Sequence, residues 1–323
     1  MTPLAVSAEE VRAAHGRLFP YLLPTPLLES SWLSERAGRT VLVKWESRQR
    51  TGSFKWRGAL HKLLCLRERG VERVLAVSAG NHGLGVAEAA RLLGMKATIV
   101  VPECAVATKV EAIARAGVEL VRRGADYDAA EAYARALAEE LGVDFVSPYN
   151  DAEVIAGQGT VALEMLGQGR FSSLIVPTGG GGLIAGCALV TADSPAPPRV
   201  IGAQPIHAPA MHDALARGGE IGPIHEEPTL ADGLSGNLES GSITVPIVAR
   251  LVSRVVLVSE QAIAAAMRAF AERDHEVVEG SAAVGAAAVI EGRLGASLVG
   301  DGPMAVIVSG RNLDLSRLRE VIA

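Results

Sequence analysis

One lysine stands between two aromatic residues in a chain where aromatic residues make up only 4%. In the stretch RTGSFKWRGAL, residues 50–60, Lys55 lies between Phe54 and Trp56, behind a Thr-Gly-Ser turn and ahead of an Arg-Gly step. A lysine amine can form a Schiff base with a carbonyl compound, which makes Lys55 a candidate for covalent catalysis. The simpler alternative is a solvated surface lysine.

Four consecutive glycines, Gly179 to Gly182, precede an apolar helical pattern. Such a turn can present several backbone N–H groups to an anion at a helix N-terminus, which suits one phosphate. Gly180, Gly182 and Ala185 also match the loose GxGxxA dinucleotide fingerprint, but the next strand ends in Gln204 instead of an acidic ribose ligand, which disfavours a dinucleotide. No GxxxxGK[ST] run indicates a nucleoside triphosphate. A plain tight turn is the simpler interpretation, although four glycines cost backbone entropy that such a turn does not need.

A phosphate site without a nucleotide fingerprint, together with a lysine flanked by aromatic residues, indicates pyridoxal 5'-phosphate held as a Schiff base. Seven blocks of sequence carry further information: TGSFKWRGA, SAGNHGLGVA, YNDAEVIAGQGT, PTGGGGLIAG, LADGL, EGSAAVG and SGRNLDL. They occur in the order expected of the fold-type II pyridoxal-phosphate enzymes. Over nearly its whole length the chain resembles the threonine/serine dehydratase and serine racemase group.

The resemblance implies a role for each matching residue at the cofactor. Lys55 matches the Schiff-base lysine, and Phe54 matches the aromatic residue beside the cofactor ring. Asn81 matches the group that hydrogen-bonds the ring hydroxyl, and Ser309 matches the partner of the pyridine nitrogen. The residues expected to bind the phosphate are Gly179, Gly180, Gly181, Gly182 and Leu183.

The resemblance also implies a loop that binds the substrate carboxylate through side-chain and backbone donors. This loop comprises Ser78, Ala79, Gly80, Asn81 and His82. Taken alone, His82 would more often be an ordinary loop histidine. Serine racemases carry a second serine where this chain has Ala79, and that serine handles the proton on the opposite face of the substrate. Two-base racemisation would lack one base here, so the sequence favours a dehydratase.

The identity of Ser309 bears on the expected reaction. An aspartate at that position would hold the pyridine nitrogen protonated, whereas a serine leaves the ring largely neutral, and a neutral ring favours β-elimination over transamination. The resemblance thus implies an ammonia-lyase of the dehydratase type, in which the Lys55 amine removes the Cα proton as general base. The expected substrate is a β-hydroxy amino acid, either threonine, serine or a bulkier analogue such as hydroxyaspartate or phenylserine. The products would be a 2-oxo acid and ammonia.

Two alternatives use the same cofactor, an amino-acid racemase and a β-replacement synthase. A third, from a different class, is a sensor that binds pyridoxal phosphate or an amino acid without turnover. The presence of Lys55, Asn81 and Ser309 together argues against the sensor. Ammonia release would exclude the sensor, enantiomer exchange would identify the racemase, and a stable intermediate awaiting a nucleophile would identify the synthase.

Two positions depart from many relatives at a site where those relatives bind a divalent cation. The relatives read EP and carry an aspartate six residues beyond the glutamate, whereas this chain has Gln204 and Ala210. Magnesium prefers charged oxygen ligands, so we expect no metal at this site. His207 and His212 lie nearby, but two histidines without a matched carboxylate are more often surface residues.

Two further departures leave the roles of the residues open. Arg311 replaces a glycine of the family's common SGGN, and it could be solvated or could reach the substrate. Ser235, Asn237 and Glu239 form a polar cluster after LADGL. The cluster could border the pocket for the substrate side chain, or it could be an ordinary loop before the next helix.

Alternating strand and helix patterns must position these residues. From residue 71 onward β-rich runs alternate with helical runs, and the alternation resumes at residue 172. The pattern predicts an α/β protein with mostly parallel sheets flanked by helices, and the resemblance implies the two-domain, tryptophan synthase β-like fold. We expect a large cofactor-binding domain at residues 1–70 and 148–323 and a small mobile domain at residues 71–147. Closure of the small domain would bring the carboxylate donors to the substrate and exclude water.

The net charge and the two terminal segments indicate which classes of partner and compartment to expect. A net charge of -5 with both signs dispersed offers no footprint for nucleic acid or an anionic membrane, so the expected partner is a small amino-acid substrate. The first residues lack the pattern of a signal peptide, and Ser7 with Glu10 instead predicts a helix capping box. The apolar runs are too short to span a bilayer. The resemblance implies a homodimer, and an end at Ala323 leaves no room for the regulatory domain of biosynthetic threonine dehydratases.

Cysteine usage indicates the compartment. Cys65, Cys104 and Cys187 are odd in number, widely spaced and free of any CxxC motif. We predict that they are reduced core thiols in a cytoplasmic protein.

Overall fold

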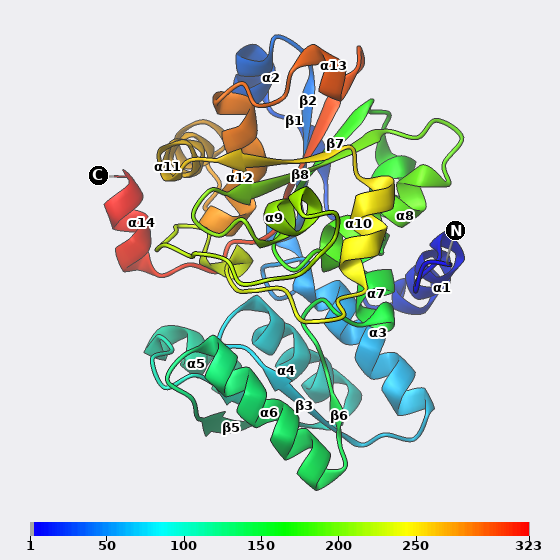
Figure 1. Ribbon diagram of the computed structural model, residues 1–323, viewed down its shortest axis with the longest axis vertical. Helices are drawn as coiled ribbons and strands as arrows, with labels where there is room; N and C mark the ends of the chain where they lie inside the picture. Colours follow the sequence, from blue (N-terminus) through cyan, green and yellow to red (C-terminus); the bar gives the residue numbers. More distant parts are fainter. Residues whose placement is uncertain (1–2, 323) are drawn as a thin grey trace.

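The strands of the computed structural model, which describes residues 3–322, form two separate sheets (Figure 1). The larger sheet contains β1 (Leu27–Glu29), β2 (Val41–Trp45), β7 (Ser173–Pro177), β8 (Arg199–Pro205), β9 (Arg254–Val258) and β10 (Met304–Val308). The smaller sheet contains β3 (Arg73–Val77), β4 (Lys96–Val101), β5 (Glu119–Arg122) and β6 (Asp144–Phe145). The strand orders are β1-β2-β10-β7-β8-β9 and β5-β4-β3-β6. Only β1 and β2 pair antiparallel among the strands of residues 3–322, so the predicted α/β class with mostly parallel sheets is confirmed.

Helices cover both faces of the larger sheet. One face packs against α1 (Ala8–Leu18), α7 (Ala152–Gln168), α8 (Gly182–Ala192), α9 (Ala210–Ala216) and α10 (Thr244–Leu251). The other packs against α2 (Ser31–Ala37), α11 (Glu260–Ala269), α12 (Gly280–Ile290), α13 (Ala296–Val299) and α14 (Leu315–Ile322). Because β7 and β10 are buried on both faces, their sequences show no polar alternation and, after Ser173 at the start of β7, are apolar throughout.

The smaller sheet has its own two layers of helices and lies at the lower end of the molecule in Figure 1. One face packs against α3 (Lys55–Glu68), α4 (Asn81–Leu93) and α5 (Ala107–Ala114), and the other against α6 (Tyr127–Leu141). Helix α3 also packs against α7, so it lies between the two sheets. All strands of the smaller sheet fall within residues 71–147, and the movement of this segment as a domain stays a prediction.

Short polar contacts set the start of the first helix. The Ser7 hydroxyl accepts a hydrogen bond from the Glu10 backbone N–H at 3.2 Å, and the Ser7 backbone N–H donates to the Glu10 carboxylate at 2.7 Å. This reciprocal pair confirms the predicted capping box.

The three cysteines differ in their surroundings. Cys65 and Cys187 are free and buried, as predicted for core thiols. The prediction was wrong for Cys104, which is exposed because it lies in the turn that leaves β4. No helix within residues 3–322 is both long enough and apolar enough to cross a lipid bilayer.

Candidate active site

Lys55 is the first residue of α3, and its side chain is partly buried. The amine donates a hydrogen bond to the Pro148 carbonyl oxygen at 2.8 Å and lies 5.3 Å from the centre of the Phe54 ring. Desolvation lowers the pKa of Lys55 to about 8, against the opposing pull of the Glu279 carboxylate. An amine with this pKa can release and take up a proton near neutral pH, as a general base must.

Tyr149 joins the lysine to the glycine turn. It follows Pro148, and its ring lies against Gly180, where an added Cβ would stand 2.4 Å from Cδ1 of the ring. At Gly182 an added Cβ would stand 3.1 Å from the Tyr149 Cα. Glycine at these two positions therefore allows the segment of Ser147, Pro148, Tyr149 and Asn150, hereafter the 147–150 segment, to lie directly on the turn.

The glycine turn leaves backbone N–H groups at the start of α8. Gly181 is the N-cap residue with φ +89°, and no side chain caps the helix. The first hydrogen bond along α8 runs from the Ala185 N–H to the Gly181 carbonyl at 2.9 Å, so the N–H groups before it lack an acceptor within the helix. An added Cβ on Gly181 would lie 2.6 Å from Met211 Cε and 2.9 Å from Thr244 Oγ1. The turn thus has the N–H donors and the lack of side chains that an anion site needs.

The predicted carboxylate loop runs from Ser78 into the first turn of α4. Gly80 is the N-cap residue, and its N–H donates to the Ser78 hydroxyl at 3.0 Å, while Ser78, Ala79 and Asn81 are partly exposed. The ring of His82 is buried and its Nε2 donates to the Val146 carbonyl at 2.9 Å. Burial, helped by the Lys55 charge, lowers the pKa of His82 to about 3, so the ring is neutral. The expected side-chain donor at His82 is therefore turned away, and its backbone N–H is what remains for a carboxylate.

Glu279 is a site residue that the sequence analysis missed. Its carboxylate accepts from Asn81 Nδ2 at 2.7 Å and from the Asn312 backbone N–H at 3.1 Å, while Asn312 Nδ2 donates to Asn81 Oδ1 at 2.6 Å. Burial raises the pKa of Glu279 to about 7, and the nearby Asp232 adds to the shift. An acidic residue directly before helix α12, in which every residue except Ser281 is apolar or glycine, was the signal that could have identified it.

Ser309 lies at the carboxyl end of β10 and is buried. Its carbonyl accepts from the Phe54 N–H at 3.0 Å, and Gly310 forms a bridge with Ser53. These contacts place Phe54, Lys55 and Ser309 side by side. The side chain of Arg311 is exposed, which favours the solvated interpretation of that residue.

Buried ion pairs support the first turn of α3 from behind. Arg57 donates to both oxygens of Glu46, at 2.8 and 2.7 Å, and to Glu164 at 3.1 Å. Lys44 pairs with the same Glu164. The side chains of Lys44, Glu46 and Arg57 are fully buried, so each charge depends on its partners and the turn that carries Lys55 is tightly held.

The remaining predicted positions lie outside these contacts. The side-chain oxygen of Gln204 accepts from the His212 N–H at 3.0 Å, and His207 Nδ1 donates to the Pro228 carbonyl at 2.8 Å. The expectation that no metal binds here stays a prediction. Asn237 accepts from the Ile224 N–H at 3.3 Å, away from Lys55, whereas Glu239 contacts the 147–150 segment.

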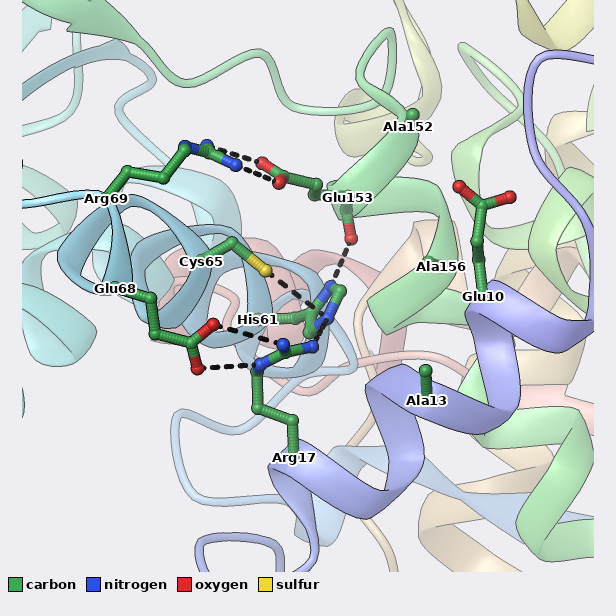
Figure 2. A pocket seen from close by; sticks show the side chains of 10 residues that line it. All are labelled: Glu10, Ala13, Arg17, His61, Cys65, Glu68, Arg69, Ala152, Glu153 and Ala156. Atoms are coloured by element: carbon green, nitrogen blue, oxygen red, sulfur yellow. Dashed lines mark hydrogen bonds and ion pairs between the residues drawn. The ribbon is translucent and has the colours of Figure 1, made fainter.

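A separate surface pocket of about 290 Å³ lies between α1, α3 and α7 (Figure 2). Four of its charged side chains pair with one another, Arg17 with Glu68 and Arg69 with Glu153. Burial lowers the pKa of His61 and raises that of Cys65 to about 11, so the histidine is neutral and the thiol is protonated. The protonated thiol is a poor nucleophile, and His61 Nδ1 already donates to the Glu153 carbonyl at 2.7 Å, so the candidate active site is the cluster around Lys55.

The chain matches one enzyme family along most of its length. Residues 18–310 fit the family model described as pyridoxal-phosphate dependent enzyme. The catabolic L-threonine dehydratase of Staphylococcus aureus is 36% identical over 320 residues, which cover 98% of this chain and 92% of that protein. The solved structure of maize serine racemase has a TM-score of 0.91 at 35% identity over 98% of this chain and 96% of the other. A solved T.th. threonine deaminase has a TM-score of 0.87 at 40% identity over 96% of this chain and 99% of the other.

These matches confirm the predicted resemblance and the fold-type II class. They also confirm the predicted cofactor, pyridoxal 5'-phosphate. The chain belongs to the family of pyridoxal-phosphate-dependent enzymes.

Proposed function

We propose that the protein is a dehydratase that releases ammonia from a β-hydroxy amino acid and leaves a 2-oxo acid. The observation that carries the proposal is the Lys55 amine, whose pKa is lowered to about 8 between the glycine turn and the N-terminus of α4. Relatives named L-threonine dehydratase and threonine deaminase, together with the structure named serine racemase, make threonine and serine the first substrates to test.

The residues around Lys55 suit the functional groups of pyridoxal 5'-phosphate. The uncapped start of α8, whose glycines leave no room for a Cβ, offers N–H donors to the phosphate. Lys55 offers an amine to the aldehyde, with Phe54 beside the ring. Asn81 offers an amide to the ring hydroxyl, and Ser309 a hydroxyl to the pyridine nitrogen. We therefore assign cofactor binding to Phe54, Lys55, Asn81, Ser309 and the turn of Gly179–Gly182 with Leu183.

Lys55 is the proposed general base. Bound pyridoxal phosphate supplies an electron-withdrawing group that weakens the Cα–H bond of an amino acid. Lys55 Nζ takes the Cα proton, because its lowered pKa keeps a useful fraction of the amine neutral near pH 7 to 8. The N–H groups at the start of α4 and the Ser78 hydroxyl hold the substrate carboxylate, in the loop from Ser78 to His82. We propose that closure of residues 71–147 excludes water while the β-hydroxyl leaves.

A racemase is the second candidate, favoured by the high structural similarity to maize serine racemase. Ala79 stands against it, because a methyl group cannot carry a proton to the face of the substrate opposite Lys55. Enantiomer exchange without 2-oxo acid would establish the racemase.

We further propose that the protein works in the cytoplasm as a homodimer. The free thiols of Cys65 and Cys187 suit a reducing compartment. Exposed large apolar side chains in the segment after α1, including Phe19 and Leu23, and at Val277 offer surface that a second copy would cover. Light scattering of the purified protein tests the subunit number.

An absorption spectrum and a substrate panel test the function directly. The wild type should show a cofactor band near roughly 410–420 nm and form 2-oxo acid and ammonia from at least one L- or D-β-hydroxy amino acid. Lys55→Ala should lose the band and reduce turnover by about a thousandfold or more. A band without 2-oxo acid from any panel member would overturn the dehydratase proposal.

A further inference from the structure

Glu239 contacts the 147–150 segment at three of its four residues. Its carboxylate accepts from the Ser147 hydroxyl at 3.2 Å and from Asn150 Nδ2 at 3.0 Å. Its backbone N–H donates to the Tyr149 hydroxyl oxygen at 2.7 Å. The fourth residue, Pro148, carries the carbonyl that accepts from Lys55 Nζ. The acceptor of the catalytic amine is thus held between contacts made by one residue.

The loop that follows Glu239 adds two further hydrogen bonds, one to the 147–150 segment and one to the glycine turn. The Ile243 N–H donates to Asn150 Oδ1 at 2.9 Å, so the Asn150 amide is held at both ends by the same loop. The Thr244 hydroxyl donates to the Gly180 carbonyl at 2.7 Å, which ties the loop to the glycine turn as well. The lysine acceptor and the phosphate turn therefore share one support.

Arg135 adds a link to the smaller sheet. It lies on α6, donates to the Glu239 carboxylate at 2.6 Å, and stacks its guanidinium 4.3 Å from the centre of the Phe145 ring. Because the Glu239 side chain is only 18% exposed, this charge-assisted bond helps to stabilise its carboxylate. Glu239 is thus the point where α6, the 147–150 segment and the loop at 239–244 meet.

We propose that Glu239 is a positioning residue that sets the place of the Pro148 carbonyl and of the Tyr149 ring, and through them the Lys55 amine and the glycine turn. The expected effect of Glu239 on turnover rests on the proposed function. Its expected effect on cofactor retention does not depend on that function. It gives a role to one member of the polar cluster that the sequence analysis left open.

Cofactor retention and the separation of kcat from KM test the proposal on the holoenzyme. In Glu239→Ala, release of pyridoxal phosphate on dilution, followed by visible absorbance, should be about tenfold faster, because Ser147 and Asn150 lose their carboxylate acceptor while only the backbone bond to Tyr149 remains. With the cofactor in saturating excess, kcat should fall by a similar factor while KM changes by less than about threefold. Glu239→Gln keeps an acceptor oxygen and should recover most of both losses.

Arg135→Met is the matched control, because it removes the ion pair and leaves the bonds to Ser147, Tyr149 and Asn150 in place. Its cofactor release should stay within about twofold of the wild type, because the Arg135 side chain is 43% exposed and the Glu239 carboxylate keeps its bonds to Ser147 and Asn150. Tyr149→Phe removes only the hydrogen bond that the Tyr149 hydroxyl accepts from the Glu239 N–H. It should give an intermediate rate, which keeps the test open if Glu239→Ala folds poorly. Release and kcat within about twofold of the wild type in Glu239→Ala would overturn the proposal, as would an equal loss in Arg135→Met. If the wild type forms no 2-oxo acid, the proposed function fails, and the release rates still decide the role of Glu239.

Discussion

Helices α8 and α4 begin in the same way, with a glycine N-cap and no side-chain cap, but the two turns are held by different means. Gly181, before α8, has φ +89° and no room for a Cβ, and all of α8 except its last residue is buried. Gly80, before α4, has φ -118°, and an added Cβ would come no closer than 3.9 Å, to Ser78 Oγ. Packing closes the first turn, whereas the second is partly exposed.

The side-chain contacts around the two turns also differ in burial, being more buried near the first turn than near the second. Behind Lys55, on the side of the larger sheet, the charges of Arg57 and Glu46 are fully buried and mutually dependent. The smaller sheet is joined to the rest by side-chain pairs that include an exposed partner or an amide. These pairs include Arg50 with Glu88, Asn81 with Glu279, Thr108 with Asp314, Lys109 with Asp232 and Arg135 with Glu239. A rigid turn suits a phosphate that stays bound, and reversible contacts suit a carboxylate that arrives and leaves with each turnover.

Removing Arg57, which supports Lys55 on the side of the larger sheet, should cause the largest loss of stability. Arg57→Met leaves Glu46 and Glu164 without their shared cation, and an unpaired buried charge costs about 3 to 5 kcal/mol of unfolding free energy. Arg50→Met is the control, since Arg50 pairs with Glu88 at 3.2 Å near solvent and should cost less than about 1 kcal/mol. Urea unfolding of both variants measures the difference, and equal losses would contradict the distinction.

Glu279 should make stability depend on pH. Its raised pKa means that the folded protein keeps the proton up to about pH 7, whereas the unfolded chain releases it near the ordinary value of 4.5. The folded state binds more protons in that window, so the unfolding free energy falls as pH rises from about 4.5 to 7, by on the order of 3 kcal/mol. Glu279→Gln removes the titrating group while keeping one acceptor for Asn81. The variant should lose this slope and exceed the wild type in stability at pH 8, and a wild-type slope in the variant would refute the assignment.

The two N-cap glycines give a matched pair of substitutions. Gly181→Ala forces a Cβ into left-handed backbone beside Met211 and Thr244 and should cost about 2 kcal/mol, with weaker retention of the cofactor. Gly80→Ala meets no steric obstacle and should change stability by less than about 0.5 kcal/mol. Thermal melting and absorbance on dilution measure both effects. A Gly80→Ala loss as large as that of Gly181→Ala would remove the contrast between the turns.

The part of the site on the larger sheet, with Lys55 and the glycine turn, was easier to predict from the sequence than the part on the smaller sheet. The glycine run, the lysine between aromatic residues and the apolar strands β7 and β10 are local patterns, and local patterns can be read directly. Strand β2 was not identified, because Lys44 interrupts its apolar run and is neutralised by Glu164, which lies on a distant helix.

The roles that the sequence analysis missed, as for Glu279, or left open, as for Glu239, depend on contacts between distant segments. Glu279 meets Asn81 across 198 positions, and Glu239 meets Arg135 across 104. The direction of the His82 ring likewise follows from a carbonyl at Val146, 64 residues away. The spacing of residues within one segment cannot predict such long-range contacts. The polar contacts between the smaller sheet and the rest of the molecule therefore became visible only in the structure.

Lys109 should give the smallest change in stability and the clearest change in substrate binding. Its amine pairs with Asp232 at 2.8 Å, and the Asp232 side chain is 63% exposed, so Lys109→Met should cost less than about 0.5 kcal/mol. Because the pair joins α5 to the loop beside Glu279, its loss should loosen the closed arrangement and raise KM a few-fold, with cofactor retention unchanged. Arg317→Met, which breaks an exposed pair with Glu320 within α14, is the control and should leave KM as it is. An unchanged KM in Lys109→Met would mean that this surface pair does not affect substrate binding. The contact between Asn81 and Glu279 would then be the one expected to hold the smaller sheet in the closed arrangement.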